Sequence, residues 1–192
     1  MAPVGIGTME QGPAFRCRTE GLRDTGLIRA AKAATLRRMS AKPIPDGYPA
    51  ITPYLVVEGA ARAIDFYKDI FGATERMRMM GPQGRVGHAE LSIGGSLLML
   101  ADACPEMNGI APASGGGSPV GLHLYVEDAD AVVARAVAAG AKVDRPVVTT
   151  FYGDRTGSII DPFGHHWHVA THVEDVSPEE IQRRMAAMKP GG

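Results

Sequence analysis

The feature of this sequence that most restricts its fold is an internal repeat. The segment VVEGAARAIDFYKDIFGA (Val56–Ala73) has a counterpart in YVEDADAVVARAVAAGA (Tyr125–Ala141). Each is predicted to hold the end of a strand, an acidic turn and an amphipathic helix, followed by Gly-Ala. A glycine turn leading into a strand also occurs twice, in IGGSLLML and PFGHHWHV. One shift of 69 residues relates both pairs, since it matches Val57 with Val126 and Gly95 with Gly164. A single spacing at two separate landmarks indicates duplication of one structural unit.

Each repeat is predicted to form a strand, a helix and three further strands. In the first repeat, the β-rich segment AITPYLVVEG ends at Gly59, and Gly72 is placed to end the helix that follows. The turns GPQG and GG separate the strands TERMRMM, RVGHAELSI and SLLMLAD. The helix carries one apolar stripe at helical spacing, made of Ala63, Ile64, Tyr67, Ile70 and Phe71. The second repeat follows the same order. We therefore predict an α+β fold of two tandem βαβββ units, with curled mixed sheets around a cavity and the helices on the outer face.

Composition and the repeat together predict the boundaries. We expect the first unit over residues 48–104, a flexible Gly/Pro linker over 105–118, the second unit over 119–174 and a C-terminal helix over 177–188. Residues 48–174 would form one domain. The C-terminal helix is indicated by a capping box of Ser177 and Glu180, with Pro178 in the first turn.

The first 42 residues differ from the rest in charge. They hold eight Lys and Arg against Glu10, Glu20 and Asp24, a net charge of +5, whereas the whole chain has a formal net charge of -1. A basic, Gly-rich segment of this kind fits a nucleic-acid arm or a transit peptide. We interpret it instead as a disordered extension. Translation could begin at Met1 or at Met39.

The remaining composition is that of a globular protein in a reducing compartment. Hydrophobic residues make up 45% of the chain and charged residues 21%. No apolar run approaches the roughly 18 residues that a membrane span needs. The N-terminus lacks the apolar segment of a secretory signal. Two cysteines are too few for a disulfide framework or a thiolate zinc site. We therefore expect a cytoplasmic protein that binds neither membranes nor nucleic acid.

Two segments give the chain a resemblance to a known family. AIDFYKDIFGA in the first helix and DPFGHHWHVA in the last hairpin resemble the vicinal-oxygen-chelate superfamily, which includes glyoxalase I, bleomycin-resistance proteins, extradiol dioxygenases and fosfomycin-resistance enzymes. The resemblance is greater to its glyoxalase-like branch, which is often labelled after a phosphonate-operon protein. It covers about Tyr48 to Glu174 and is specific for the fold rather than for an activity.

Alternation along the strands predicts which side chains face a pocket. In VGLHLYV, Leu122 and Leu124 share one face while His123 and Tyr125 share the other. Uniformly apolar faces should carry the helices, and the mixed faces should line a concave pocket for a small ligand. In HHWHV the same rule places Trp167 beneath a helix. His165 is expected outside the pocket, and His172 near the exposed strand end. The predicted ligand-binding residues are Thr52, Tyr54, Met99, His123, Tyr125, Tyr152, His166 and His168.

The resemblance also implies where a metal would bind. Metal-binding members take four ligands from inward positions on the first and last strands of each unit. In this sequence those positions hold Thr52, Met99, Gly121 and His168. Only His168 is a competent ligand for a divalent metal, because glycine has no side chain and a thioether and a hydroxyl suit such a site poorly. We therefore predict no metal or other cofactor. A divalent metal held instead by His123, His166 and His168 stays open as an alternative.

Other polar residues have two interpretations each. His88 and Glu90 alternate on one strand, so they either share the pocket face as an acid/base pair or form a polar pair on an edge strand. Asp154 and Arg155 are predicted to form a local ion pair in a loop. Asp161 begins the hairpin turn DPFG, which we interpret as structural.

These residues predict two classes of function. The first is a homodimeric binding protein whose His- and Tyr-lined cavity holds a small hydrophobic or aromatic molecule without the usual metal ligands. The second is an enzyme of isomerase, lyase or dioxygenase type. It would use His123, His166 or His168 as catalytic residues, or an unusually placed metal.

Overall fold

The structure is a computed structural model that describes residues 42–107, 109–112 and 117–188. The basic extension predicted over residues 1–42 lies outside the described residues, apart from Lys42. From Ile44 onward the described chain forms one unit, which contains both repeats. No helix within these described stretches is long and apolar enough to cross a membrane.

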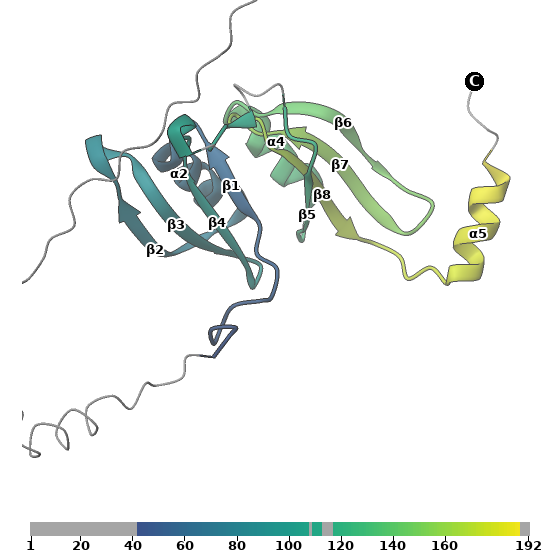
Figure 1. Ribbon diagram of the computed structural model, residues 1–192. Coiled ribbons are helices and arrows are strands. Elements are labelled where there is room, and N and C mark those ends of the chain that lie inside the picture. Colours follow the sequence, from purple (N-terminus) through teal and green to yellow (C-terminus); the bar gives the residue numbers. More distant parts are fainter. Residues whose placement is uncertain (1–41, 108, 113–116, 189–192) are drawn as a thin grey trace, which may run out of the picture. The chain divides into compact units, whose positions relative to one another are not determined.

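The first repeat folds into a four-stranded sheet with one long helix (Figure 1). The sheet has the strand order β1-β4-β3-β2, in which β1 runs parallel to β4 and the other neighbours are antiparallel. Single turns of 3-10 helix lie at Pro82–Gly84 and Pro105–Met107. The elements are β1 (Tyr54–Val57), α2 (Ala60–Phe71), β2 (Thr74–Met80), β3 (Val86–Ile93) and β4 (Ser96–Asp102).

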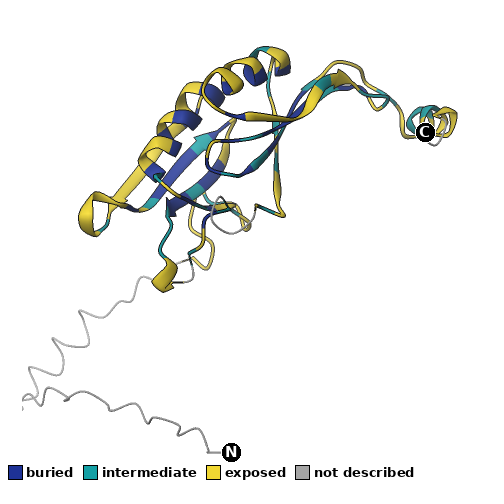
Figure 2. Ribbon diagram, turned by 90° about the horizontal axis from the view of Figure 1, so that it is seen from above, coloured by how far each residue is buried: buried dark blue, intermediate teal, exposed yellow. Residues whose placement is uncertain are grey.

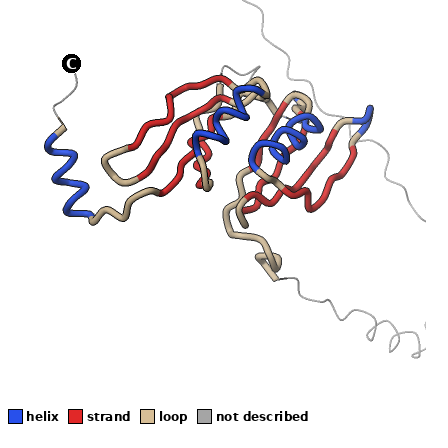
Figure 3. The backbone as a smooth tube through the Cα atoms, turned by 180° about the vertical axis from the view of Figure 1, so that it is seen from behind, coloured by secondary structure: helices blue, strands red, loops and turns tan. Residues whose placement is uncertain are grey.

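The second repeat has the same topology. Its strands follow the order β5-β8-β7-β6, and β5 is again parallel to the last strand, β8. In each repeat, the helix that follows the first strand packs on the sheet of that repeat, as Figure 3 shows in blue against red. Two open mixed sheets of this kind confirm the predicted α+β class and the tandem βαβββ units. The elements are β5 (Gly121–Tyr125), α4 (Ala129–Ala138), β6 (Lys142–Thr149), β7 (Asp154–Ile160) and β8 (His166–His172).

A C-terminal helix, α5 (Pro178–Ala187), follows the second sheet. The Ser177 hydroxyl accepts a hydrogen bond from the Glu180 backbone N–H at 3.2 Å, which is the cap that the sequence predicts. Arg184 joins the helix to the preceding segment through Glu174, at 2.7 Å between Nη2 and Oε1.

The duplication extends to the way in which each helix begins. Asp102, at the end of β4, accepts hydrogen bonds from the backbone N–H groups of Gly59 and Ala60 at 2.9 and 2.7 Å. In the second repeat, the Thr171 hydroxyl of β8 accepts from Ala129 N–H at 2.9 Å. Because Thr171 lies 69 residues after Asp102, the last strand of each unit caps the helix of that unit from an equivalent position.

The core lies between the sheets and their helices (Figure 2). Every residue of the predicted α2 stripe is buried, from Ala63 to Phe71. The apolar strand faces are buried as well, including Val57, Leu100 and Val169. Phe163 and Trp167 of the second repeat contact the aromatic side chains of α2, with ring centroids 4.5 Å apart for Phe71 and Trp167. The two repeats therefore share one core.

Asp161 is the polar centre of this shared core. Its carboxylate is 3% exposed and accepts hydrogen bonds from the Tyr67 hydroxyl at 2.7 Å and from Trp167 Nε1 at 2.9 Å. It also accepts from the backbone N–H groups of Phe163 and His165, at 2.9 Å each. Four donors satisfy the buried carboxylate, one of them from the first repeat. Asp161 thus does more than form the hairpin turn that the sequence indicates.

Candidate ligand-binding site

The sheet faces opposite the helices carry the polar side chains. On the first sheet, strand register places Tyr54, Met99 and Glu90 in one row across β1, β4 and β3. On the second sheet, His123, His168 and Ser158 form the corresponding row across β5, β8 and β7. The 69-residue shift relates Tyr54 to His123 and Met99 to His168. The first two members of each row therefore occupy the same positions of the duplicated unit.

The second sheet has a small open hollow on this face, of about 240 Å³. The imidazole rings of His123 and His168 lie face to face there, with centroids 6.2 Å apart and planes inclined by 27°. The Tyr125 ring packs against His123 at 4.8 Å between centroids. This second-sheet hollow is lined by residues that include His123, Arg145, Tyr152, Thr156, Ser158 and His168. It therefore gathers His123, Tyr152 and His168 of the predicted set, with Tyr125 beside them.

The other predicted residues lie elsewhere. His166 is half-buried on the same face of β8 as His168, in register with Gly121 and Ile160, and does not line the hollow. Thr52, Tyr54 and Met99 lie in the first repeat. His165 is buried and does not line the second-sheet hollow, and its Nε2 lies 3.2 Å from the Val56 carbonyl oxygen. In a single chain the eight residues thus do not line one common cavity.

The positions that the family resemblance implies for a metal do not fit one. A Cβ atom on Gly121 would lie 2.7 Å from His168 Nε2, so the His168 ring occupies the space that a ligand side chain at position 121 would need. Thr52 and Met99 supply poor donors for a divalent ion. Across the described residues, no three His, Cys, Asp or Glu side chains are grouped so that they could hold a metal. This also holds for His123, His166 and His168, which stand as the alternative set.

A buried carboxylate lies at the start of β7, in register with His172 of β8. Asp154 is 5% exposed and accepts hydrogen bonds from the Tyr125 hydroxyl and from His172 Nδ1, both at 2.8 Å. The second nitrogen of His172 lies 3.0 Å from Asp175. Burial alone would raise the pKa of Asp154, but the hydrogen bonds from His172 and Tyr125 bring it below the ordinary value.

The predicted local ion pair of Asp154 and Arg155 is therefore wrong. Asp154 begins β7 and turns inward to Tyr125 and His172, whereas Arg155 turns outward and binds Asp130, with Nη2 and Oδ1 2.7 Å apart. Alternation explains the difference, because neighbours in a strand point to opposite faces.

A second buried carboxylate lies on the first sheet. Glu90 is 5% exposed, and the Tyr48 hydroxyl lies 2.9 and 2.8 Å from its two oxygens. His88 Nε2 is 3.4 Å from Glu90, and His88 Nδ1 is 3.2 Å from the Tyr54 hydroxyl. The hydrogen bond from Tyr48 lowers the pKa of Glu90 against the effect of burial. Because β3 lies between β4 and β2, His88 and Glu90 are not an edge-strand pair. Tyr48 precedes the first strand and gave no periodic signal.

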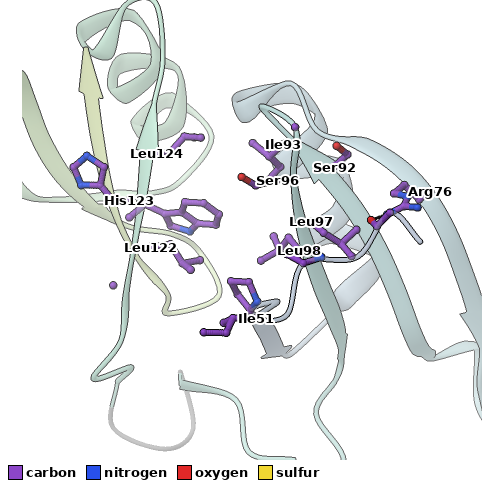
Figure 4. A pocket seen from close by; sticks show the side chains of 16 residues that line it. Ile51, Arg76, Ser92, Ile93, Ser96, Leu97, Leu98, Leu122, His123 and Leu124 are labelled. Carbon is purple, nitrogen blue, oxygen red and sulfur yellow. Dashed lines mark hydrogen bonds between the residues drawn. The ribbon is translucent and has the colours of Figure 1, made fainter. Parts of the chain in front are cut away.

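A larger hollow, of about 750 Å³, is lined by both repeats. In Figure 4, Leu122 and Leu124 point from β5 towards Ile93 and Leu98, whereas His123 points the other way. Arg76 is the charged residue in this mainly apolar lining. The hollow belongs to the apolar faces of the strands, which strand alternation assigns to the helices, so the sequence did not predict it.

Comparisons with known proteins agree with this fold. The sequence model of the Glyoxalase/Bleomycin resistance protein/Dioxygenase superfamily matches residues 49–169. Protein Mb0911c of Mycobacterium bovis is 46% identical over 146 residues, which cover 74% of this chain and 96% of that protein. The structure of the Arabidopsis thaliana protein At5g48480 is 33% identical, with a TM-score of 0.52 over 64% of this chain and 98% of that one. A Bacillus cereus PhnB protein, described as a putative 3-demethylubiquinone-9 3-methyltransferase, shares the fold at 21% identity, with a TM-score of 0.52 over 64% and 99% of the two chains.

Proposed function

Because the chain belongs to the glyoxalase/bleomycin resistance protein/dioxygenase superfamily, we propose that it binds a small hydrophobic or aromatic molecule without the usual metal ligands. The proposed site is the second-sheet hollow with its histidine and tyrosine rings. We further propose that the protein acts as a cytoplasmic homodimer.

The position of the His168 ring above Gly121 carries this proposal. At the equivalent sites the resemblance implies metal ligands, yet here an imidazole fills the space of one ligand and the remaining donors are weak. The ring is then available to a ligand as a stacking surface and as a hydrogen-bonding group. Without a metal, the ligand would be recognised by aromatic and polar contacts.

The side chains around the hollow suit a flat or aromatic ligand. The ring planes of His123 and His168 are inclined by 27°, and Tyr152 lines the hollow while Tyr125 packs beside His123. The volume of about 240 Å³ is below the 300–1,000 Å³ of common ligand pockets. A small ligand is therefore favoured, unless a second copy of the chain adds a further wall.

Two measurements on the full-length protein test the proposal. Metal analysis of the purified protein should find less than stoichiometric metal. A thermal-shift screen of small aromatic molecules should identify a stabilising compound, whose affinity is then measured by calorimetry. His168→Ala should weaken that binding at least tenfold, whereas His166→Ala, on the same strand but outside the hollow, should change it little. A stoichiometric ion that is lost in His168→Ala would refute the metal-free site.

The second candidate function is an enzyme of the superfamily, of isomerase, lyase or dioxygenase type. The observation that favours it is the pairing of histidines with buried carboxylates, Glu90 on one sheet and Asp154 on the other. Such pairs are typical of acid–base sites, although structural networks contain them as well. Consumption of the stabilising compound during incubation with the protein would favour this function over simple binding.

A further inference from the structure

We propose that Tyr54, His88 and Glu90 form an acid–base relay on the first sheet, in which the Tyr54 phenol is the group that meets the reacting molecule. This site is separate from the second-sheet hollow. It would carry out a chemical step in addition to the binding function proposed above. The two proposals use different residues, so either can fail alone.

The three side chains are connected in sequence by their hydrogen-bonding atoms. The Tyr54 hydroxyl lies 3.2 Å from His88 Nδ1, and His88 Nε2 lies 3.4 Å from Glu90 Oε1. The Tyr54 and His88 rings are 5.6 Å apart between centroids. The distance to Glu90 is at the long end of the range, which is common for catalytic hydrogen bonds when no substrate is bound.

Exposure falls steadily along this chain of residues. Tyr54 is 50% exposed, the side chain of His88 21% and that of Glu90 6%. An accessible phenol is thus joined through a half-buried imidazole to a buried carboxylate. A chain of this kind lets an external group exchange a proton with the histidine while the carboxylate stays out of solvent.

The direction of the hydrogen bonds follows from the carboxylate. Tyr48 donates to Glu90, and the pKa of Glu90 is lowered chiefly by this contact, so the group is an anion near neutral pH. An anionic carboxylate has only acceptors, so a neutral His88 places its proton on Nε2. Nδ1 then accepts the hydrogen bond from the Tyr54 hydroxyl. The tautomer is fixed by its neighbour in the way that a carboxylate fixes a catalytic histidine.

The relay would move one proton. When the Tyr54 oxygen takes a proton from a substrate, its own phenolic O–H bond breaks and an Nδ1–H bond forms on His88. The imidazolium that results faces the Glu90 carboxylate, which stabilises its charge. The substrate keeps the electron pair of the broken bond, and the proton returns by the reverse route to the same or a neighbouring atom. No oxidant, reductant or other reactant is needed.

A hollow beside Tyr54 has room for such a substrate. This first-sheet hollow encloses about 710 Å³ and is lined by residues that include Tyr54, Val56, Arg85, Gly87, Cys104 and Glu106. Its size is within the range of small-molecule sites. Since the relay ends on an imidazole, the class of substrate is a small molecule with a weakly acidic proton, such as a C–H group next to a carbonyl.

The second sheet contains a tyrosine that serves as an internal control. Tyr125 is 58% exposed, similar to Tyr54, but its hydroxyl donates directly to Asp154. The pKa of Asp154 lies below its ordinary value because hydrogen bonds outweigh the effect of burial, so this carboxylate is a weak base. The hydrogen bond with Asp154 also raises the pKa of Tyr125, which makes its phenol harder to ionise. Of these two tyrosines, Tyr54 is the one whose hydroxyl meets an imidazole rather than a carboxylate.

Acetylation by p-nitrophenyl acetate tests the relay without a known substrate. The phenol oxygen attacks the acetyl carbon, p-nitrophenolate leaves with the bonding pair, and the phenolic proton passes to the base. At pH 7.5, mass spectrometry of the full-length protein should show Tyr54 acetylated about 100-fold faster than Tyr125, the lower end of what a positioned base contributes. Equal rates for Tyr54 and Tyr125 would overturn the proposal.

Two conservative variants separate a relay from a merely structural network. His88→Asn keeps an acceptor near Nδ1 but cannot take a proton, so the rate at Tyr54 should fall to that at Tyr125. Glu90→Gln should keep the fold but move the midpoint of the pH–rate profile at Tyr54 to lower pH, because the imidazolium loses its counter-charge. Circular dichroism serves as the control that both variants are folded. An unchanged rate in His88→Asn or an unmoved midpoint in Glu90→Gln would exclude the proposed roles of these residues.

Discussion

Trp167 and His168 are neighbours in β8 and face opposite sides of the sheet. Trp167 is 3% exposed, lies against Phe71 and donates its indole N–H to Asp161. Trp167→Ala should lower the free energy of unfolding by about 3–5 kcal/mol, because removing a large buried ring leaves a cavity. His168→Ala is the matched control and should cost much less, since His168 borders an open hollow. Urea denaturation of both variants measures the difference. Equal losses would contradict the assignment of the two faces.

Individual site residues were predictable only where alternation decides the matter. The two-residue period placed His123, Tyr125 and His168 on one face and Trp167 on the other, as the structure has them. The tyrosine partners of Glu90 and Asp154 were not predictable. Tyr48 lies 42 residues before Glu90, and Tyr125 lies 29 residues before Asp154. Contacts at such separations depend on strand order and register, which hydrophobic patterning does not specify residue by residue.

His172 connects the end of β8 to the start of β7 and to the segment that leads to α5. Its two ring nitrogens face Asp154 and Asp175, and both contacts raise the pKa of His172, that with Asp154 most. A pKa that is higher in the folded state gives stability that is complete below the ordinary imidazole pKa and is lost as pH rises through the raised value. The melting temperature of wild type should therefore exceed that of His172→Gln most near pH 5.5, and the difference should shrink towards pH 8.5. A difference that grows with pH would refute the charged contact.

The turn between β6 and β7 depends on Gly153, which lies against the segment that leads from β8 to α5. Gly153 has φ of 96°, and a Cβ atom there would lie 2.1 Å from the Glu174 carbonyl oxygen. Its own carbonyl oxygen accepts from the backbone N–H groups of Val173 and Glu174. Any side chain at position 153 would push the two segments apart. The C-terminal segment is thus held to the second sheet by backbone contacts as well as by His172.

Helices and strands were the most predictable part of the fold. The apolar stripe of α2, the Gly72 stop and the Ser177 cap are local signals, and each corresponds to an observed feature. The capping of α2 by Asp102 is not local, since Asp102 follows Gly59 by 43 residues, and Gly59 itself carries no side chain that could cap. The sequence therefore predicted the position of α2 but not the side chain that accepts hydrogen bonds from its first N–H groups.

At the scale of the whole molecule, the exposed edge strand β2 favours association with a second copy of the chain. Each residue of β2 is exposed, and it presents Met77, Met79 and Met80 along an unpaired edge. Exposed apolar edges of this kind are usually covered. We therefore expect a homodimer at micromolar concentration, with a mass by light scattering of twice the chain mass of 20.3 kDa.

The C-terminal helix offers a way to test how the dimer forms. Met185 and Met188 are exposed on α5 and its end, and together with Ile181 they form an apolar strip. Replacing both methionines by serine should weaken the dimer, whereas Gln182→Ser, at an exposed polar position of the same helix, should not. A strictly monomeric wild type would contradict the prediction.

Asp161 has a consequence for how the protein comes apart. Its carboxylate holds Tyr67 of the first repeat and Trp167 of the second on the same buried group. Opening the first repeat would remove the Tyr67 donor from this buried carboxylate, and opening the second would leave the buried Tyr67 hydroxyl without its acceptor. We therefore expect the duplicated halves to unfold in one cooperative transition, which calorimetry would record as a single peak. Because the two halves share Asp161, neither half has a complete core of its own.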